Sequence, residues 1–419
     1  MKKRALSLLL ASVCSAAVLS CGCGGGSSDS IIILDSADRT QASTLTVFGN
    51  RTDRYSLSVI EDTLQSFMSA SPVIATYEGA AANYWQALDK RYETGNLDDI
   101  FAIEHDRLLS MTETLADLTD IVNPNIFGDF ARSQLYTDGK IYAVPTSIST
   151  YGLFVNYDLL KKHGQSIPTN LDEFTAVCDY FKDSVTPVIC NDSSSIYSLI
   201  LAVGMYDTYC KADTAGEIEK FNSNPSSLAG ELFKGVDFVY EMINNGWIDL
   251  NEAAVTGSVS GDLELFASGE RPFMITGSWA SDTLKEMQNA TLSYGIHAYP
   301  VLKEGGVLVA RTDMLSVKKG KNESEAKKLI SRLTDADTLL ALNENQSRFS
   351  PLNITQIYAD ATIMPSASHL TKGRYVVSAD NRITLPLEGY LAKCTSLIIK
   401  GESKQAVQAH LASLLGGDR

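Results

Sequence analysis

Apolar strand patterns and amphipathic helix patterns alternate between residues 45 and 103, and this order restricts the fold more than any other feature. Strands are predicted at Leu45–Phe48, Val73–Tyr77 and Asp99–Ile103, and the two segments between them have helical periodicity. A strand–helix–strand–helix–strand order is typical of parallel strands joined by right-handed crossovers. The sequence therefore predicts an α/β fold in which helices flank a sheet.

Two loops follow the carboxyl ends of predicted strands, where ligands bind in open parallel sheets. The first loop contains Asn50 and Arg51, and the second contains Glu104 and His105. Amide, guanidinium, carboxylate and imidazole groups form directional hydrogen bonds with hydroxyl groups. These four residues are predicted ligand contacts, and a solvated loop is the alternative interpretation.

The first 20 residues have the pattern of a bacterial export signal. A basic start at Lys2-Lys3-Arg4 precedes an apolar segment that is too short to span a membrane. The segment Val18-Leu19-Ser20-Cys21 is similar to a lipobox, in which the cysteine receives lipid. We predict a lipoprotein signal peptide at 1–20, acylation of Cys21 with Cys23 as the alternative, and a flexible Gly- and Ser-rich tether at 21–41. A plain cleaved signal is the other interpretation.

Composition and motifs exclude several classes of function. A formal net charge of −15 argues against nucleic acid and against electrostatic attachment to anionic lipid. The five histidines lack the spacing of a metal site, no cofactor motif occurs, and the seven cysteines form no regular disulfide framework. No nucleophile motif is present, so the chain is predicted not to be an enzyme, although a carboxylate pair suited to glycoside hydrolysis stays open.

Three blocks, in order along most of the chain, carry a family resemblance. Residues 140–181 contain "YAVP", an apolar strand ending in Asn156-Tyr157, and "PTNLDEF". Residues 263–306 contain "GSW" followed by a helix pattern and "YP", and residues 322–351 contain two helix patterns ending in "FSP". Together these blocks resemble the extracellular solute-binding proteins of ABC transporters, in the branch that includes the maltose-type binding proteins.

The resemblance implies a two-lobed periplasmic-binding-protein-like fold of type II. Each lobe would be a mixed sheet flanked by helices, with the ligand cleft between the lobes. Residues 42–150 and 303–348 would form the N-lobe, and residues 151–302 and 349–419 the C-lobe. The lobes of such a fold close on a ligand by a hinge motion.

Trp279 is the strongest single candidate for ligand contact. It follows Gly277-Ser278, where the strand pattern "PFMIT" ends, and it lies off the apolar stripe of the helix pattern that follows. A ring at the carboxyl end of a strand can stack on the apolar face of a sugar, as the Gly-x-Trp tryptophan of the resembled family often does. Packing at the edge of a lobe is the alternative. Tyr151, beside the first crossing between lobes, and Arg311, on a returning strand, are further candidates.

The resemblance and Trp279 together predict a lipid-anchored, monomeric substrate-binding component of an ABC importer that binds a sugar or oligosaccharide. It would lie at the outer face of the cell membrane, or face a periplasm, and deliver its ligand to the permease subunits. Neither cofactor nor metal is expected. A secreted lipoprotein glycoside hydrolase and a ligand sensor for a membrane kinase are the alternatives.

Overall fold

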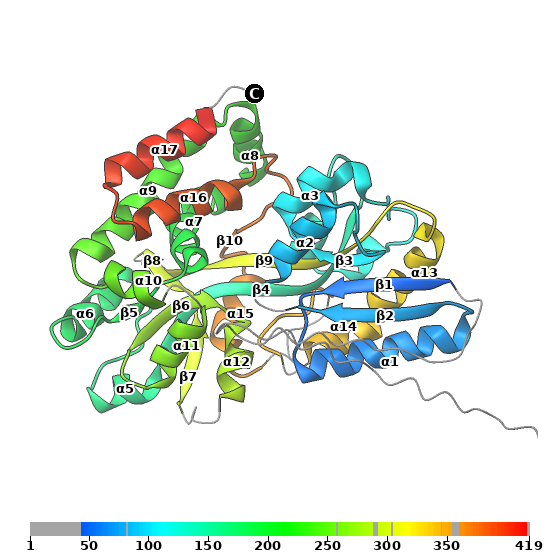
Figure 1. Ribbon diagram of the computed structural model, residues 1–419. Coiled ribbons are helices and arrows are strands. Elements are labelled where there is room, and N and C mark those ends of the chain that lie inside the picture. The colour runs from blue at the N-terminus through cyan, green and yellow to red at the C-terminus, as the bar shows by residue number, and fades with distance from the viewer. Residues whose placement is uncertain are drawn as a thin grey trace, which may run out of the picture.

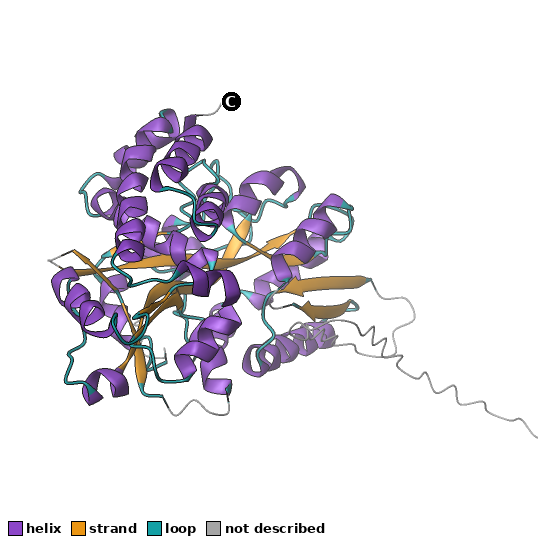
Figure 2. Cartoon of the chain, turned by 60° about the vertical axis from the view of Figure 1, so that its left-hand side comes forward, coloured by secondary structure: helices purple, strands orange, loops and turns teal. Residues whose placement is uncertain are grey.

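Ten strands form one mixed sheet, and helices cover both of its faces (Figures 1 and 2). The structure is a computed structural model that describes residues 43–416 apart from 81–82, 257–258, 288–291, 303–304, 345 and 354–359. The predicted signal peptide, Cys21, Cys23 and the tether lie outside the described residues. Within the described part of the chain, no helix is long and apolar enough to cross a membrane.

The strands alternate with helices as the sequence predicted for the first hundred residues. The strands are β1 (Thr44–Gly49), β2 (Ile74–Gly79), β3 (Ile100–Ile103), β4 (Ala143–Asn156), β5 (Val188–Ile189), β6 (Phe273–Gly277), β7 (Tyr294–His297), β8 (Tyr299–Leu302), β9 (Gly305–Val317) and β10 (Tyr375–Val377).

The helices up to residue 256 are α1 (Arg54–Ala70), α2 (Tyr84–Glu93), α3 (His105–Met111), α4 (Asp129–Ser133), α5 (Tyr157–Lys162), α6 (Leu171–Phe181), α7 (Ser193–Tyr209), α8 (Thr214–Ser223), α9 (Ser226–Asn244) and α10 (Leu250–Thr256). The later helices are α11 (Val259–Ala267), α12 (Ala280–Glu286), α13 (Glu323–Leu333), α14 (Ala336–Asn343), α15 (Met364–Thr371), α16 (Leu387–Ile399) and α17 (Lys404–Gly416). Short 3-10 helices occupy Thr112–Thr114 and Pro124–Ile126.

Two long strands, β4 and β9, connect the two halves of the molecule. The sheet order is β2-β1-β3-β9-β4-β6-β5, with β10 and β8 beside β9 and with β7 beside β4. One half of β9 pairs antiparallel with β3, and the other half pairs with β8 and β10. Each half of the sheet therefore mixes parallel and antiparallel pairs, as predicted. Because β4 and β9 run through both halves without interruption, the lobe boundaries after residues 150, 302 and 348 stay predictions.

The two faces of β4 contact different helices, because successive side chains of a strand point to opposite faces. Tyr151 packs in a core with α7, α9 and α16, whereas Ile148 and Phe154 pack in a second core with α1, α13, α14, α11 and α12. A third core, which includes Phe48, joins α2 and α3 to the face that carries Tyr151. We call the face of β4 with Ser147, Ser149 and Tyr151 the site face, and the face with Ile148 and Phe154 the reverse face.

Candidate functional site

Trp279 stands at the corner between β6 and α12, where its ring is held in place from two sides. The strand ends at Gly277, and a Cβ atom at this position would lie 2.0–2.2 Å from atoms of the Trp279 ring. The ring of Tyr151 meets the indole edge-on, with centroids 5.0 Å apart and an angle of 83°. Trp279 is half-buried and touches both large cores. It therefore packs at the edge of the sheet while keeping part of its ring accessible.

Arg311, in the middle of β9, links Trp279 to the loop after β3. Its guanidinium lies 5.7 Å from the centroid of the Trp279 ring, and its Nη2 lies 3.1 Å from Oε2 of Glu104. Burial lowers the pKa of this guanidinium, but the Glu388 carboxylate and other nearby oxygens outweigh burial and raise the pKa above its ordinary value. Three predicted site residues from distant segments, at 104, 279 and 311, thus come together on the site face.

Tyr151 is close to these residues but is not exposed. Only 1% of its surface is accessible, and its hydroxyl lies 3.0 Å from the hydroxyl of Tyr197 on α7. Tyr197 in turn donates to Oε1 of Glu388 at 3.2 Å. Tyr151 thus packs against the Trp279 ring where α7 covers the strand, and its role as a ligand contact stays a prediction.

His105 also proves to be buried rather than part of a solvated loop. It is 2% exposed, and its Nε2 lies 3.1 Å from the carbonyl oxygen of Ile383, on the segment before α16. Burial lowers the pKa of His105, so the neutral ring donates this hydrogen bond. His105 thus links α3 to the segment that precedes α16, and its role as a ligand contact stays a prediction.

Arg51 and Asn50 end β1 beside the crossing strands. Arg51 is 8% exposed and donates from Nη2 to Oγ of Ser147 at 2.7 Å, and the same nitrogen lies 3.7 Å from Oδ2 of Asp313. Arg51 thus links the end of β1 to β4 and β9, and its role as a ligand contact stays a prediction. Asn50 is half-buried at the same edge and stays a predicted ligand contact.

Sequence reasoning missed an acidic pair between the first turns of α3 and α16. Oδ2 of Asp106 accepts a hydrogen bond from the backbone nitrogen of Gly389 at 2.9 Å. Burial and the neighbouring Glu388 carboxylate raise the pKa of Asp106 to about 7. Asp106 lay in the predicted ligand loop and could have been included with Glu104. Glu388 carried no local signal, because only the fold brings residue 388 beside α3.

The raised pKa of Asp106 predicts a dependence of stability on pH. Between its ordinary value of 3.8 and about 7, the folded protein keeps a proton that the unfolded chain has lost. The free energy of unfolding should therefore fall as the pH rises through this window, by at most about 1.4 kcal/mol per pH unit from this group. We expect Asp106→Asn to show a shallower fall in urea unfolding between pH 5 and pH 7.5.

Asp262 contributes to the pH dependence of stability in the same range and is present in both the wild type and the Asp106→Asn variant. It is fully buried, and burial together with Asp192 raises its pKa to about 7 as well. Asp106→Asn leaves that contribution intact, so the difference between wild type and variant isolates Asp106. Equal slopes in the two proteins would contradict the assignment.

The surroundings of Trp279 suit a neutral ligand rich in hydroxyl groups. The ring offers a flat apolar surface. Glu104 and Glu388 offer carboxylate oxygens, and Asp106 offers a carboxyl group, all of which can accept hydrogen bonds from hydroxyls. Arg311 is the basic group paired here with Glu104. Within the described residues, no group of three or more metal-ligating side chains comes together.

A substitution at Gly277 tests whether the position of the Trp279 ring matters for ligand affinity. Because a Cβ atom at Gly277 would overlap the indole, Gly277→Ala must displace the ring. We expect the variant to lose at least tenfold in affinity for the ligand of this site by calorimetry. Gly230→Ala is the matched control, since a Cβ atom at Gly230 of α9 meets nothing within 4 Å. Unchanged affinity in Gly277→Ala would show that the ring position does not matter.

The fold and this site define a two-lobed binding protein, and comparisons with known proteins identify its family. Residues 70–363 match the profile of the family described as bacterial extracellular solute-binding protein. The chain belongs to this family, as its sequence predicted, and the family consists of binding proteins rather than enzymes.

Individual relatives agree with this assignment. The maltodextrin-binding protein of Bacillus subtilis is 25% identical over 229 residues, which cover 52% of each chain. The chain spans about half the length of the curated relatives it matches. A Bacillus licheniformis sugar transporter protein solved with stachyose has a TM-score of 0.65 at 18% identity, covering 88% of this chain and 98% of that one.

A second solved structure extends the likeness in fold. The maltose-maltodextrin binding protein of Alicyclobacillus acidocaldarius has a TM-score of 0.68 at 15% identity, covering 89% of this chain and all of that one (100%). At these identities the solved structures establish a shared fold, and the predicted two-lobed α/β architecture is confirmed.

Proposed function

We propose that this chain is the substrate-binding component of an ABC importer and that it captures a sugar or oligosaccharide. The observation that carries the proposal is the partly exposed ring of Trp279 beside the Arg311–Glu104 ion pair, at the carboxyl end of β6. Relatives named for maltodextrin, and a structural relative solved with stachyose, support a carbohydrate ligand. The glycoside hydrolase alternative loses support from a family of binding proteins.

The proposed mechanism is closure of two lobes without covalent chemistry. Residues 42–150 with 303–348 would move against residues 151–302 with 349–419, around β4 and β9. Closure brings the acidic first turn of α3, in the N-lobe, towards a sugar that rests on Trp279 and on the first turn of α16, in the C-lobe. A membrane permease then distinguishes the closed, liganded form from the open one.

The proposed membrane anchor is a lipid on Cys21, followed by the tether at 21–41. Lipid on Cys21 would hold a monomeric protein at the outer surface of the membrane, and the tether at 21–41 would let it reach the permease subunits. Cys21→Ser is expected to release the protein from the membrane fraction, measured by fractionation of cells. Retention of the variant in the membrane fraction would contradict acylation of Cys21.

A thermal-shift screen tests the carbohydrate ligand. A ligand at 100 times its dissociation constant stabilises the folded protein by about 2.7 kcal/mol. We expect at least one sugar among maltose, maltotriose, maltodextrin and stachyose to raise the melting temperature of the wild type. A panel in which amino acids or peptides raise it and no sugar does would overturn the proposal.

A further inference from the structure

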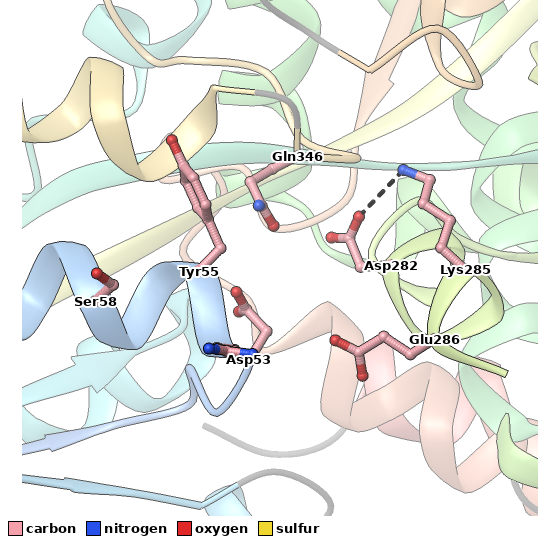
Figure 3. A pocket seen from close by; sticks show the side chains of 8 residues that line it. Asp53, Tyr55, Ser58, Asp282, Lys285, Glu286 and Gln346 are labelled. Atoms are coloured by element: carbon pink, nitrogen blue, oxygen red, sulfur yellow. Dashed lines mark ion pairs between the residues drawn. The ribbon is translucent and has the colours of Figure 1, made fainter. Parts of the chain in front are cut away.

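A cavity of about 440 Å³ lies on the reverse face, between the start of α1 and α12 (Figure 3). α1 supplies Asp53 and Tyr55 to its wall, α12 supplies Asp282 and Lys285, and Gln346 lies between the two helices. Both helices pack on the reverse-face core. None of the residues predicted as ligand contacts lines this cavity, so it is distinct from the Trp279 site.

The cavity has the size and the mixed lining of a small-molecule site. Pockets that bind small molecules usually measure about 300–1,000 Å³ and combine an apolar surface with a few convergent polar groups. The side chain of Tyr55 is 39% exposed and provides an aromatic surface. Figure 3 shows the side chains of Asp53, Asp282 and Gln346 between the two helices.

Asp282 supplies an acceptor that the protein itself does not use. Its Oδ1 accepts a hydrogen bond from the backbone nitrogen of Ser347 at 3.1 Å. Its Oδ2 is buried and has no hydrogen-bond partner among the described residues. A buried acceptor without a partner is costly, and a hydroxyl donor from a ligand would satisfy it.

The charges of the lining disfavour an anion. Asp53, Asp282 and Glu286 outnumber Arg54 and Lys285. Lys285 is also committed to partners, since its Nζ lies 2.9 Å from Oδ2 of Asp360 and donates to Oγ of Ser347 at 3.0 Å. A neutral molecule with several hydroxyl groups and one apolar ring face matches this lining best.

We propose that the cavity between α1 and α12 is a second binding site, which takes a neutral mono- or disaccharide independently of Trp279. The proposal rests on the proposed function only for the class of ligand. The cavity and the Trp279 site lie on opposite faces of β4, so the two sites do not share a binding surface.

Calorimetric titration of the protein with glucose, maltose and stachyose, up to millimolar concentrations, tests the second site. We expect two phases for the wild type. Tyr55→Ala and Asp282→Asn should each weaken the affinity of the same phase at least tenfold and leave the second phase unchanged. Trp279→Ala should weaken the affinity of that second phase alone. Asp282→Asn keeps an acceptor for Ser347, so the fold is preserved. Tyr92→Ala on α2, where the tyrosine is 37% exposed and outside the cavity, is the control for Tyr55→Ala.

The variants separate this inference from the proposed function. A single phase that survives Tyr55→Ala and Asp282→Asn but is lost in Trp279→Ala overturns the second site and leaves the proposed function standing. Phases that respond to the cavity variants and not to Trp279→Ala support the second site and overturn the role of Trp279. Sugar binding that none of the three variants changes overturns both the second site and the role of Trp279.

Discussion

Trp279→Ala is expected to weaken the binding of the transported sugar more than tenfold, which corresponds to about 1.4 kcal/mol. The indole is partly exposed and lies beside the guanidinium of the Arg311–Glu104 pair. Removing it takes away the apolar area on which a sugar ring can stack, and it also removes the aromatic contact of the Arg311 guanidinium. Calorimetry with the sugar found by thermal shift measures the change.

Trp279→Ala is also expected to lower the stability of the fold. Because Trp279 packs on Tyr151 and on both large cores, Trp279→Ala should lower the free energy of unfolding by about 2 kcal/mol, less than the 3–5 kcal/mol of a fully buried tryptophan. Trp247→Phe is the control, since Trp247 is 3% exposed and donates to Asp179 away from the site. It should lose stability with unchanged affinity. The same pattern in Trp279→Ala would assign Trp279 to packing alone.

Local sequence patterns predicted the fold well where each element carries its own signal. The strand predicted at Leu45–Phe48 is β1, and Asn170 of "PTNLDEF" caps α6, where it accepts a hydrogen bond from the backbone nitrogen of Glu173 at 3.0 Å. These signals depend on neighbours within a few residues. The register in which β4 and β9 join both halves depends on residues far apart in the chain, and sequence periodicity does not contain it.

The sequence predicted only part of the candidate site, because local patterns do not contain the contacts between distant segments. Glu104, Trp279 and Arg311 were chosen because each ends or crosses a strand, and the sheet brings them together. Tyr151 and His105 met the same criterion but are buried, because α7 covers one and the segment before α16 covers the other. Burial by an element that lies far away in sequence leaves no local pattern, so the burial of these two side chains could not be predicted.

Arg311→Met is expected to cost the most stability of any substitution in this site. The side chains of Arg311 and Glu104 are only 13% and 12% exposed, so removing the cation leaves a largely buried carboxylate with less compensation. Breaking a buried ion pair costs about 3–5 kcal/mol, and the second partner of Glu104, Arg107, places the expected loss near the lower value. Urea unfolding at pH 7 measures it.

Two further variants test whether the loss of stability comes from breaking the buried Arg311–Glu104 ion pair. Arg132→Met removes an exposed pair with Asp129 and should change stability by less than about 1 kcal/mol. The double variant Glu104→Gln/Arg311→Met removes both charges and should recover part of the loss, because no buried carboxylate remains unpaired. If Arg311→Met costs no more than Arg132→Met, the ion pair does not stabilise the fold. Arg311 would then serve ligand binding alone, and sugar affinity would fall without any change in unfolding.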